Sequence, residues 1–306
     1  MSSTTREPAP MLEVDVERLD AQLPELLAEL ATGRGAIVIR QAFADDEIAE
    51  ARALVHHYSD TEDAKETHFQ GANQDRLHLQ RRVWNLLNKG EVFERMVQHP
   101  AVMTIIGRFL GSAFIMGSVA DNRLLPGGPG QEPHVDYPYW DMYKRDEFPM
   151  NINSSFPLNA QATVLLDPFT PESGATAYLP SSQGDLRYPD EHDRDHFDAH
   201  AARMTGDPGD CVIFNGMCWH CAMPNTSASI DRTGILIEYL PKFVTPLEDL
   251  RRGVRADVVE RATPMLRQLM GLEYPYPEIL DDNTGEATIG RDVDADSHSA
   301  IAATGP

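Results

Sequence analysis

A histidine and an aspartate, both common metal ligands, stand two residues apart as His134 and Asp136 in the segment GPGQEPHVDYPYW. Because residues two apart in a strand point to the same face, this imidazole and this carboxylate can bind one cation from a single short element. A His-x-Asp pair occurs by chance in many chains, so the pair alone is a weak signal. It indicates a metal site only together with a further ligand from elsewhere.

A second histidine, His220, ends the segment GDCVIFNGMCWH, in which Asn215 and Gly216 separate two apolar runs. Asn-Gly is the strongest short-range hairpin signal, so we expect a two-residue turn with His220 on the returning strand of a buried sheet. A buried histidine needs a partner for each ring nitrogen, and a metal ion would supply one. The same hairpin would place Cys211 beside His220, which makes this thiol a candidate pocket residue.

His134, Asp136 and His220 on facing strands would form the 2-His-1-carboxylate facial triad of non-heme Fe(II) centres. Such a triad leaves three positions open on the ion, so a bidentate 2-oxo acid and dioxygen can bind there. A closed four-ligand zinc site could bind neither. The alternative is that the two histidines are unrelated core or surface residues.

Arg232 follows His220 by twelve residues and begins the apolar run 233–240. A buried guanidinium needs an anion, and its planar fork suits a carboxylate bidentately. Two interpretations are open. Arg232 binds an acidic cosubstrate beside the metal, or it forms a structural salt bridge with Asp231 or Glu238.

The elements that position these side chains follow from hydrophobic periodicity. Leucines at helical spacing predict a helix over 16–31, and further helices are expected from residue 45 and over 100–110. From about residue 113 the chain changes to short β-type runs, which is typical of an all-β sandwich or barrel. The expected strands are 114–125, 133–137, 159–166, 174–180, 211–215, 217–222 and 233–240, and a helical pattern returns over 246–271.

The chain contains no internal repeat and no low-complexity linker that would divide it. We therefore predict one domain over residues 1–280, with a β core at about 113–241, a helical N-terminal part and a C-terminal helix. Residues 184–208 form a polar insertion whose place beside the sheet suggests a lid over the substrate mouth. Residues 281–306 are acidic and are expected to form a disordered tail.

The 306 residues include 26 Lys and Arg against 48 Asp and Glu, a formal net charge of −22. This balance disfavours binding to nucleic acid or to an anionic membrane, so a small molecule is the expected partner, with a homodimer left open. The sequence has no stretch of roughly 18 apolar residues and no signal-peptide layout at its start. We therefore expect a cytoplasmic protein whose three cysteines are not part of a disulfide framework.

Four blocks, in order, resemble the phytanoyl-CoA dioxygenase (PhyH) family of Fe(II)- and 2-oxoglutarate-dependent oxygenases. The blocks are GPGQEPHVDYPYW, LLDPFTPESGATAYLPSSQ, GDCVIFNGMCWHCAMPNTS and RTGILIEYLP, and the resemblance covers roughly residues 36–245. It implies a mainly β fold with flanking helices around a double-stranded β-helix, a jelly-roll and cupin-like core. It also implies an oxidoreductase, a dioxygenase that uses Fe(II), 2-oxoglutarate and dioxygen.

Carried over residue by residue, the resemblance implies His134, Asp136 and His220 as the iron ligands. Arg232 matches the partner of the distal carboxylate of 2-oxoglutarate. Members that halogenate have a small residue in place of the carboxylate ligand. Because Asp136 is present, the resemblance favours hydroxylation or a related oxidation.

Three further positions concern the cosubstrate. Thr176 and Gln131 match positions that some members of the family use to bind it. Members often have a serine contact two residues after the distal histidine, and here that position is Ala222. Another group must therefore assist Arg232.

The expected reaction is hydroxylation of a small organic substrate. The alternatives are desaturation, epoxidation, cyclisation or endoperoxide formation with the same cofactors, or a non-catalytic jelly-roll binding protein. An acyl-CoA would bring several phosphates to an acidic chain, which favours a secondary metabolite or amino-acid derivative over an acyl-CoA hydroxylase. Candidate pocket residues are Tyr137, Tyr139, Trp140, Tyr143 and Gln161.

Two other patterns could also carry chemistry. Cys218 and Cys221 form a Cys-x-x-Cys, but residues three apart in a strand point to opposite faces, so the two thiols cannot easily meet. His192, His196 and His200 follow helical spacing and could bind a second metal ion. We expect instead that they lie on a solvated helix of the insertion.

Overall fold

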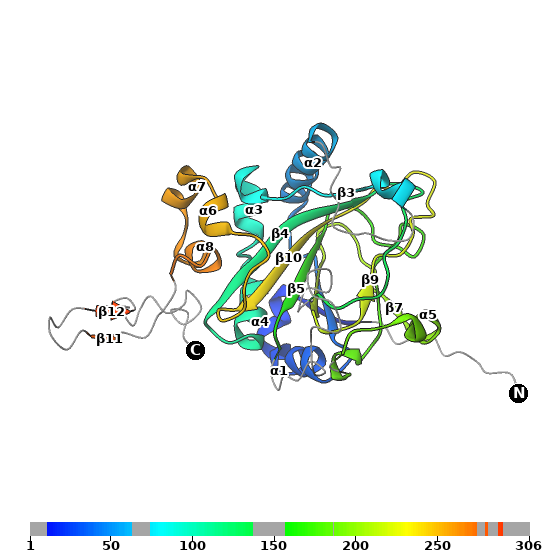
Figure 1. Cartoon of the computed structure of the whole chain (residues 1–306), viewed down its shortest axis with the longest axis horizontal. Helices are drawn as coiled ribbons and strands as arrows, with labels where there is room; N and C mark the ends of the chain where they lie inside the picture. The colour runs from blue at the N-terminus through cyan, green and yellow to red at the C-terminus, as the bar shows by residue number, and fades with distance from the viewer. Residues whose placement is uncertain are drawn as a thin grey trace, which may run out of the picture.

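The computed structural model describes residues 11–62, 74–136, 157–185, 187–273, 279–280 and 287–289. Its centre is a seven-stranded sheet in the order β1-β2-β8-β5-β10-β4-β3, with a three-stranded sheet, β7-β6-β9, beside it (Figure 1). The strands of the large sheet are β1 (Leu12–Asp15), β2 (Ala36–Arg40), β3 (Gln80–Arg81), β4 (Phe114–Leu124), β5 (Ala160–Leu165), β8 (Cys211–Asn215) and β10 (Arg232–Pro241). The strands of the small sheet are β6 (Ala177–Tyr178), β7 (Ala202–Arg203) and β9 (His220–Cys221).

The two faces of the large sheet have different roles. Along β10, Ile235, Ile237 and Tyr239 pack into the main hydrophobic core. Leu236 and Glu238, which alternate with them, point the other way and line a cavity. Because side chains alternate along a strand, one face stabilises the fold while the other face is free to form a site.

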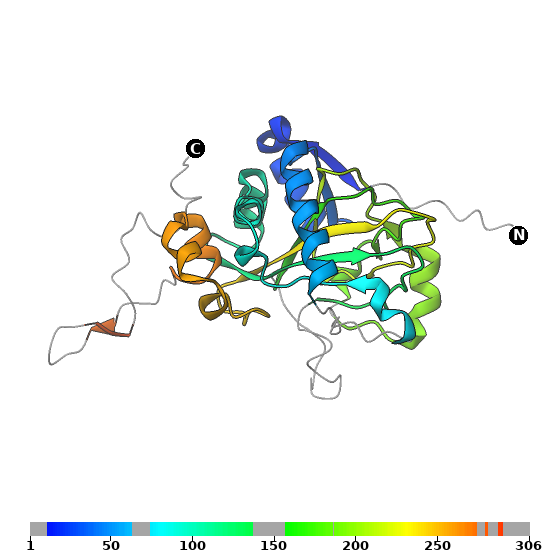
Figure 2. The same ribbon diagram turned by 90° about the horizontal axis from the view of Figure 1, so that it is seen from above.

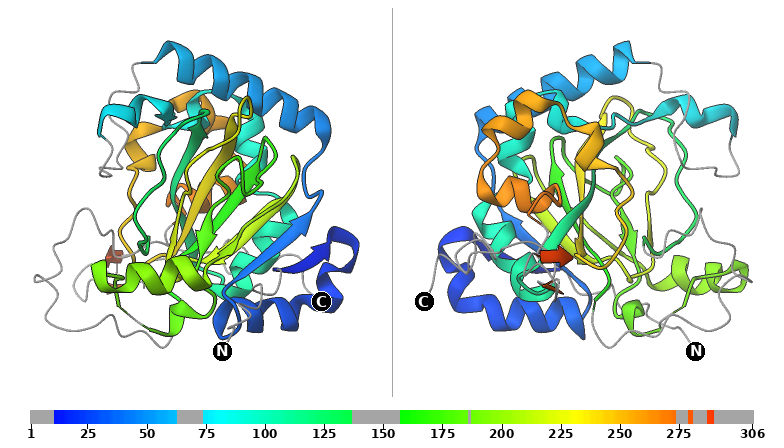
Figure 3. Two further views of the ribbon diagram at one scale, coloured as in Figure 1. Left: turned by 90° about the vertical axis from the view of Figure 1, so that its right-hand side faces the viewer. Right: turned by 60° about the vertical axis from the view of Figure 1, so that its left-hand side comes forward.

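Helices cover the outer face of the large sheet, on the side away from the small sheet (Figures 1, 2 and 3). They are α1 (Leu19–Ala31), α2 (Asp45–Thr61), α3 (Glu91–Met96), α4 (Pro100–Phe109), α6 (Leu250–Gly253), α7 (Ala256–Arg261) and α8 (Pro264–Leu269). Leu26 of α1 and Ile105 of α4 are fully buried in the core that they share with the sheet. The 3-10 segments are η1 (Val16–Arg18), η2 (Gln74–Leu79), η3 (Leu86–Asn88), η5 (Ser182–Gly184) and η6 (Glu191–Asp193).

The mainly β fold with flanking helices is confirmed, and the helices expected at 16–31, 45 and 100–110 form within a few residues of their predicted bounds. Two predicted elements are wrong in detail. Of the predicted strand 133–137, the described residues 133–136 contribute only an isolated bridge, between His134 and His220. The helical pattern over 246–271 is three short helices, because Thr263 stands in an extended conformation before Pro264, where a helix cannot continue.

The hairpin expected at Asn215 and Gly216 is also wrong. β8 pairs with β2 on one side and β5 on the other, so both of its edges are occupied and the chain cannot pair back on itself. A turn closed by the Cys218 amide and the Asn215 carbonyl (2.9 Å) sends the chain to the small sheet, where β9 pairs with β6. Cys211 therefore does not lie opposite His220. It pairs with Ile39 and Val164 and packs in the helix-side core.

The polar insertion contains η6 and the helix α5 (Arg194–His200), which packs beside the small sheet through the buried Phe197. An ion pair of 2.7 Å joins Arg194 to Glu132, two residues before His134. The insertion thus contacts the segment that carries a metal-ligand candidate, and its role as a lid stays a prediction.

The C-terminal region is described only in part. Beyond residue 273 the structure describes β11 (Ile279–Leu280) and β12 (Ala287–Ile289), which pair with each other. The domain boundary at 280 and the disordered acidic tail stay predictions. Within the described residues, no helix is both long enough and apolar enough to cross a membrane.

Candidate metal centre

Backbone hydrogen bonds bring the three predicted ligands together. His134 and His220 exchange two amide-to-carbonyl bonds of 2.9 Å each, and the Asp136 amide donates to the Gly216 carbonyl at 3.0 Å. The ligand atoms of the three side chains lie within 4.8 Å of one another. Asp136 Oδ1 is 3.4 Å from Nε2 of His220 and 3.8 Å from Nε2 of His134.

Both imidazoles are oriented by backbone carbonyls. Nδ1 of His134 lies 2.8 Å from the Glu132 carbonyl, and Nδ1 of His220 lies 2.9 Å from the Cys218 carbonyl. A carbonyl only accepts, so each Nδ1 carries a proton and each Nε2 is the ring atom left to bind a metal ion. Two imidazole nitrogens and one carboxylate, with no fourth protein ligand among the described residues, are the donor set of a non-heme iron site.

Burial reinforces this arrangement. It lowers the pKa of His134 to about 4, with the neighbouring His220 adding to the effect, so the imidazole is neutral and able to bind a metal at neutral pH. Burial also disfavours the charged form of His220, but the Asp136 carboxylate outweighs it and raises the pKa of that imidazole.

The triad opens into a cavity of about 120 Å³. Of the other candidates, Gln131, Gln161, Thr176 and Arg232 line this cavity, as does Ala222, whereas Cys211 does not. Tyr137, Tyr139, Trp140 and Tyr143 lie outside the described residues. The sequence-based reasoning missed several lining residues: Arg82, Trp84, Ser118, Asn122, Thr163, Phe214, Leu236, Glu238 and Leu247.

Arg232 is 1% exposed, and its guanidinium carbon lies 4.9 Å from the centre of the Phe169 ring. Its Nε and Nη2 atoms are buried and have no hydrogen-bond partner in the described part of the chain. Burial, together with the nearby Arg82, lowers its pKa to about 10, so the side chain remains charged at neutral pH. A buried cation without a partner is costly, which points to an anion that binds in the cavity.

The structure contains neither of the salt bridges that the sequence left open for Arg232. Asp231 pairs with Arg123, at 2.7 Å. Glu238 accepts a hydrogen bond from Asn159 at 3.4 Å. Arg232 forms an ion pair with neither.

Gln131 is the described side chain best placed to assist where the family often has a serine. Its Oε1 accepts a hydrogen bond of 3.0 Å from the Ala222 amide, which fixes the side chain. Its Nε2 is buried and has no partner within the described ranges, so a donor is left over for a ligand in the cavity.

The two other patterns offer no comparable site. Cys218 and Cys221 are buried and free, and burial raises the pKa of each thiol to about 12, far from the reactive thiolate of a redox pair. Only the His134, Asp136 and His220 group qualifies as a metal cluster in the part of the chain that the structure describes. His196 and His200 lie on α5, where Nδ1 of His200 contacts the His196 carbonyl.

The two sheets and the His-Asp-His group, with both histidines buried, define a double-stranded β-helix protein with a candidate facial-triad metal centre. The family model described as phytanoyl-CoA dioxygenase (PhyH) matches residues 32–234, more than half of the chain. The chain therefore belongs to this family.

Named relatives are distant. The chain is 24% identical over 192 residues to "Dioxygenase FrzG" of Cladobotryum sp, covering 62% of this chain and 61% of the relative. It is 28% identical over 161 residues to "Iron/alpha-ketoglutarate-dependent dioxygenase penM" of Penicillium thymicola, covering 51% of this chain and 46% of the relative. The matched region thus spans less than two thirds of these relatives.

A solved structure supports the fold. The non-heme alpha ketoglutarate dependent epimerase SnoN from nogalamycin biosynthesis superposes with a TM-score of 0.53 at 18% identity, covering 73% of this chain and 84% of that one. At this identity the likeness concerns the fold alone.

Proposed function

We propose that the chain is an Fe(II)- and 2-oxoglutarate-dependent dioxygenase that hydroxylates or otherwise oxidises a small organic substrate. The observation that carries the proposal is the unpaired, buried guanidinium of Arg232, which lines the same cavity as the His-Asp-His group. The family membership and the names of the relatives support it. A non-catalytic binding protein would have no need for a facial triad and a buried anion receptor in one cavity.

Each protein group has a defined part in this function. His134, Asp136 and His220 would hold Fe(II), with the two imidazoles kept in one tautomer by backbone carbonyls. Arg232 would bind the distal carboxylate of 2-oxoglutarate, and the Gln131 amide would donate a further hydrogen bond. When bound, iron, 2-oxoglutarate and dioxygen would supply the oxidising chemistry, and 2-oxoglutarate would leave as succinate and CO2.

The first test is spectroscopic. Anaerobic addition of Fe(II) and then 2-oxoglutarate should produce a metal-to-ligand charge-transfer band, because the cosubstrate would bind to the iron held by the triad. In air the protein should then form succinate slowly, and a true substrate should accelerate it. If product forms without consumption of 2-oxoglutarate, the proposed function is wrong.

The far end of the cavity indicates the substrate class. Glu238 lies six residues along β10 from Arg232 on the same face, about 20 Å away at roughly 3.3 Å per residue. It is 2% exposed and stands opposite Ser118 on β4 and Gln161 on β5, and all three side chains line the cavity. Glu238 accepts a hydrogen bond from Asn159 at 3.4 Å, and its carboxyl group gives this end of the cavity an acidic, polar surface that suits a cationic group better than a hydrocarbon chain. A secondary metabolite or amino-acid derivative with a protonated amine fits better than an acyl chain.

Glu238→Gln should therefore weaken the response to amines. In a panel of matched free and N-acetylated compounds, the parent protein should be stimulated more by the free amines, as measured by succinate release. In the variant, the ratio of stimulation by free amines to stimulation by N-acetylated compounds should fall about tenfold. The reason is that a hydrogen bond to a charged group contributes about 1.5–3 kcal/mol. Glu260→Gln, an exposed position on α7, is the matched control. Equal stimulation of the parent by both members of each pair would contradict the assignment.

A further inference from the structure

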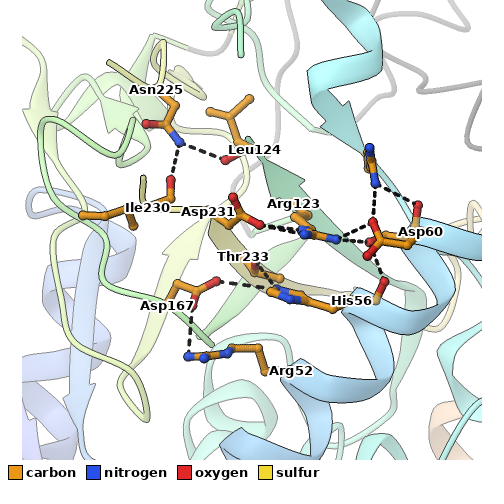
Figure 4. A network of polar contacts seen from close by, with 12 residues as sticks. Arg52, His56, Asp60, Arg123, Leu124, Asp167, Asn225, Ile230, Asp231 and Thr233 are labelled. Carbon is orange, nitrogen blue, oxygen red and sulfur yellow. Dashed lines mark hydrogen bonds and ion pairs between the residues drawn. The ribbon is translucent and has the colours of Figure 1, made fainter. Parts of the chain in front are cut away.

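Helix α2 carries a stripe of polar side chains toward the start of β10 (Figure 4). The stripe consists of Arg52, His56, Ser59 and Asp60, which share one helix face because they are spaced by about one or two turns. Each of the four contacts a residue of the sheet or of the loop after β5. None of the four lines the cavity that holds the metal-ligand group.

The first contact runs through Arg123 of β4. Its Nε and Nη2 atoms donate to Asp231 Oδ2 at 2.9 and 2.7 Å. Its Nη1 donates to Ser59 Oγ at 2.8 Å and to Asp60 Oδ1 at 2.9 Å. Arg123 is 8% exposed, and its guanidinium connects α2 to Asp231.

The second contact lies on the other side of Arg232. Nε2 of His56 is 3.3 Å from the Thr233 hydroxyl. Arg52 forms an ion pair of 3.2 Å with Asp167, two residues before the Phe169 ring on which Arg232 lies. The backbone carbonyl of Thr233 accepts the amide of Asp167 at 3.3 Å, which joins the loop to the strand.

These contacts surround Arg232 without touching it. Because side chains alternate along a strand, Asp231 and Thr233 point away from the cavity into which Arg232 points. The guanidinium itself has unpaired Nε and Nη2 atoms, so its own hydrogen bonds do not fix its direction. The direction of the Arg232 guanidinium is fixed by the backbone on either side of Arg232 and by the Phe169 ring that it contacts.

We propose that the α2 stripe, with Arg123 and Asp231, is a positioning network that holds Arg232 in the orientation that binds the 2-oxoglutarate carboxylate. The network rests on the proposed function, since it acts on the cosubstrate end of that site. Its residues are positioning residues, because none of them reaches the cavity. The affinity for 2-oxoglutarate is thus set in part by a helix on the outer face of the sheet.

Arg123→Lys and Asp231→Asn test the network. Lysine keeps the positive charge but cannot donate to Asp231 and α2 at the same time. Asparagine removes the negative charge of Asp231, to which Arg123 donates. Each should raise the dissociation constant for 2-oxoglutarate by up to roughly tenfold, because a displaced Arg232 guanidinium would lose up to one hydrogen bond to the carboxylate. The measurement is anaerobic calorimetric titration of 2-oxoglutarate into the Fe(II)-loaded protein, with Fe(II) affinity measured separately and expected to stay within about twofold.

Glu50→Gln is the matched control. Glu50 lies on the same helix and forms an ion pair of 3.0 Å with Arg95, away from β10. Its loss should leave 2-oxoglutarate affinity unchanged. If Arg123→Lys does not fold, as judged by circular dichroism, His56→Gln replaces it and should raise the dissociation constant about threefold.

The outcomes separate the two proposals. A parent protein that does not bind 2-oxoglutarate overturns the proposed function and this inference with it. A parent that binds 2-oxoglutarate, with network variants that bind it equally well, overturns the inference alone. Parallel loss of Fe(II) and 2-oxoglutarate affinity in the variants would mark a general structural role and also overturn it.

Discussion

His134→Ala, Asp136→Ala and His220→Ala are each expected to abolish Fe(II) binding, by at least about 100-fold in affinity, while the protein remains folded. Their ligand atoms converge within 4.8 Å, and two of three ligands cannot hold the ion in the same way. The fold should survive because the main hydrophobic core lies on the other face of the sheet. Iron content after anaerobic reconstitution, together with circular dichroism, measures both effects.

His192→Ala is the control for the three variants, since the side chain of His192 is 87% exposed. It should keep full iron content. If any one of the three triad variants retains normal iron occupancy and turnover, the ligand assignment is wrong. Loss of iron accompanied by loss of secondary structure would show instead that the substituted residue is needed for folding.

The grouping of the candidate site residues around one cavity could be predicted because the sequence signals are local. The spacing of His134 and Asp136 indicates that their side chains share a face. The even spacing of Arg232 and Glu238 indicates the same along β10. Glu238 was considered only as a partner for Arg232, although its even spacing from Arg232 already places it on the cavity face. The signal for a second polar end of the cavity was therefore present in the sequence.

The connection between β8 and β9 was not predictable in the same way. Asn215 and Gly216 favour a hairpin when the strand before them has a free edge. Here β2 and β5 occupy both edges of β8, which depends on segments about 50 and 175 residues earlier in the chain. Long-range strand order thus overrides a strong local signal, and it moves Cys211 from the expected site into the core.

The polar contacts of α2 could not be predicted from the sequence for a related reason. Helical periodicity places Ile48, Ala51 and Leu54 on one apolar face of α2, and the structure buries Ile48, Ala51 and Val55. It says nothing about which polar residues meet a partner, because charged residues on a helix usually face solvent. The contact of His56 with Thr233, across 177 positions of sequence, is visible only in the folded chain.

Arg232→Lys is expected to weaken 2-oxoglutarate binding by about 10- to 100-fold without removing iron. An ammonium offers a charge but not two parallel donors to a carboxylate, and hydrogen bonds to charged groups contribute about 1.5–3 kcal/mol each. Intensity of the charge-transfer band as a function of 2-oxoglutarate concentration gives the affinity. Arg203→Lys, on β7 outside the cavity lining, should have no effect. Unchanged affinity in Arg232→Lys contradicts the assignment.

Arg232→Met should stabilise the ligand-free protein while it weakens 2-oxoglutarate binding. Without 2-oxoglutarate, the parent protein buries a cation that lacks partners at Nε and Nη2. Burial lowers the pKa of Arg232 to about 10, still above neutral pH, so the unfavourable charged form is the one that is buried. An apolar side chain of similar length should raise the free energy of unfolding of the ligand-free protein by about 1–3 kcal/mol. The parent, but not the variant, should gain stability when 2-oxoglutarate is added with Fe(II). Chemical denaturation with and without 2-oxoglutarate measures both effects. If the methionine variant is less stable than the parent in the absence of ligand, Arg232 contributes to folding rather than waiting for an anion.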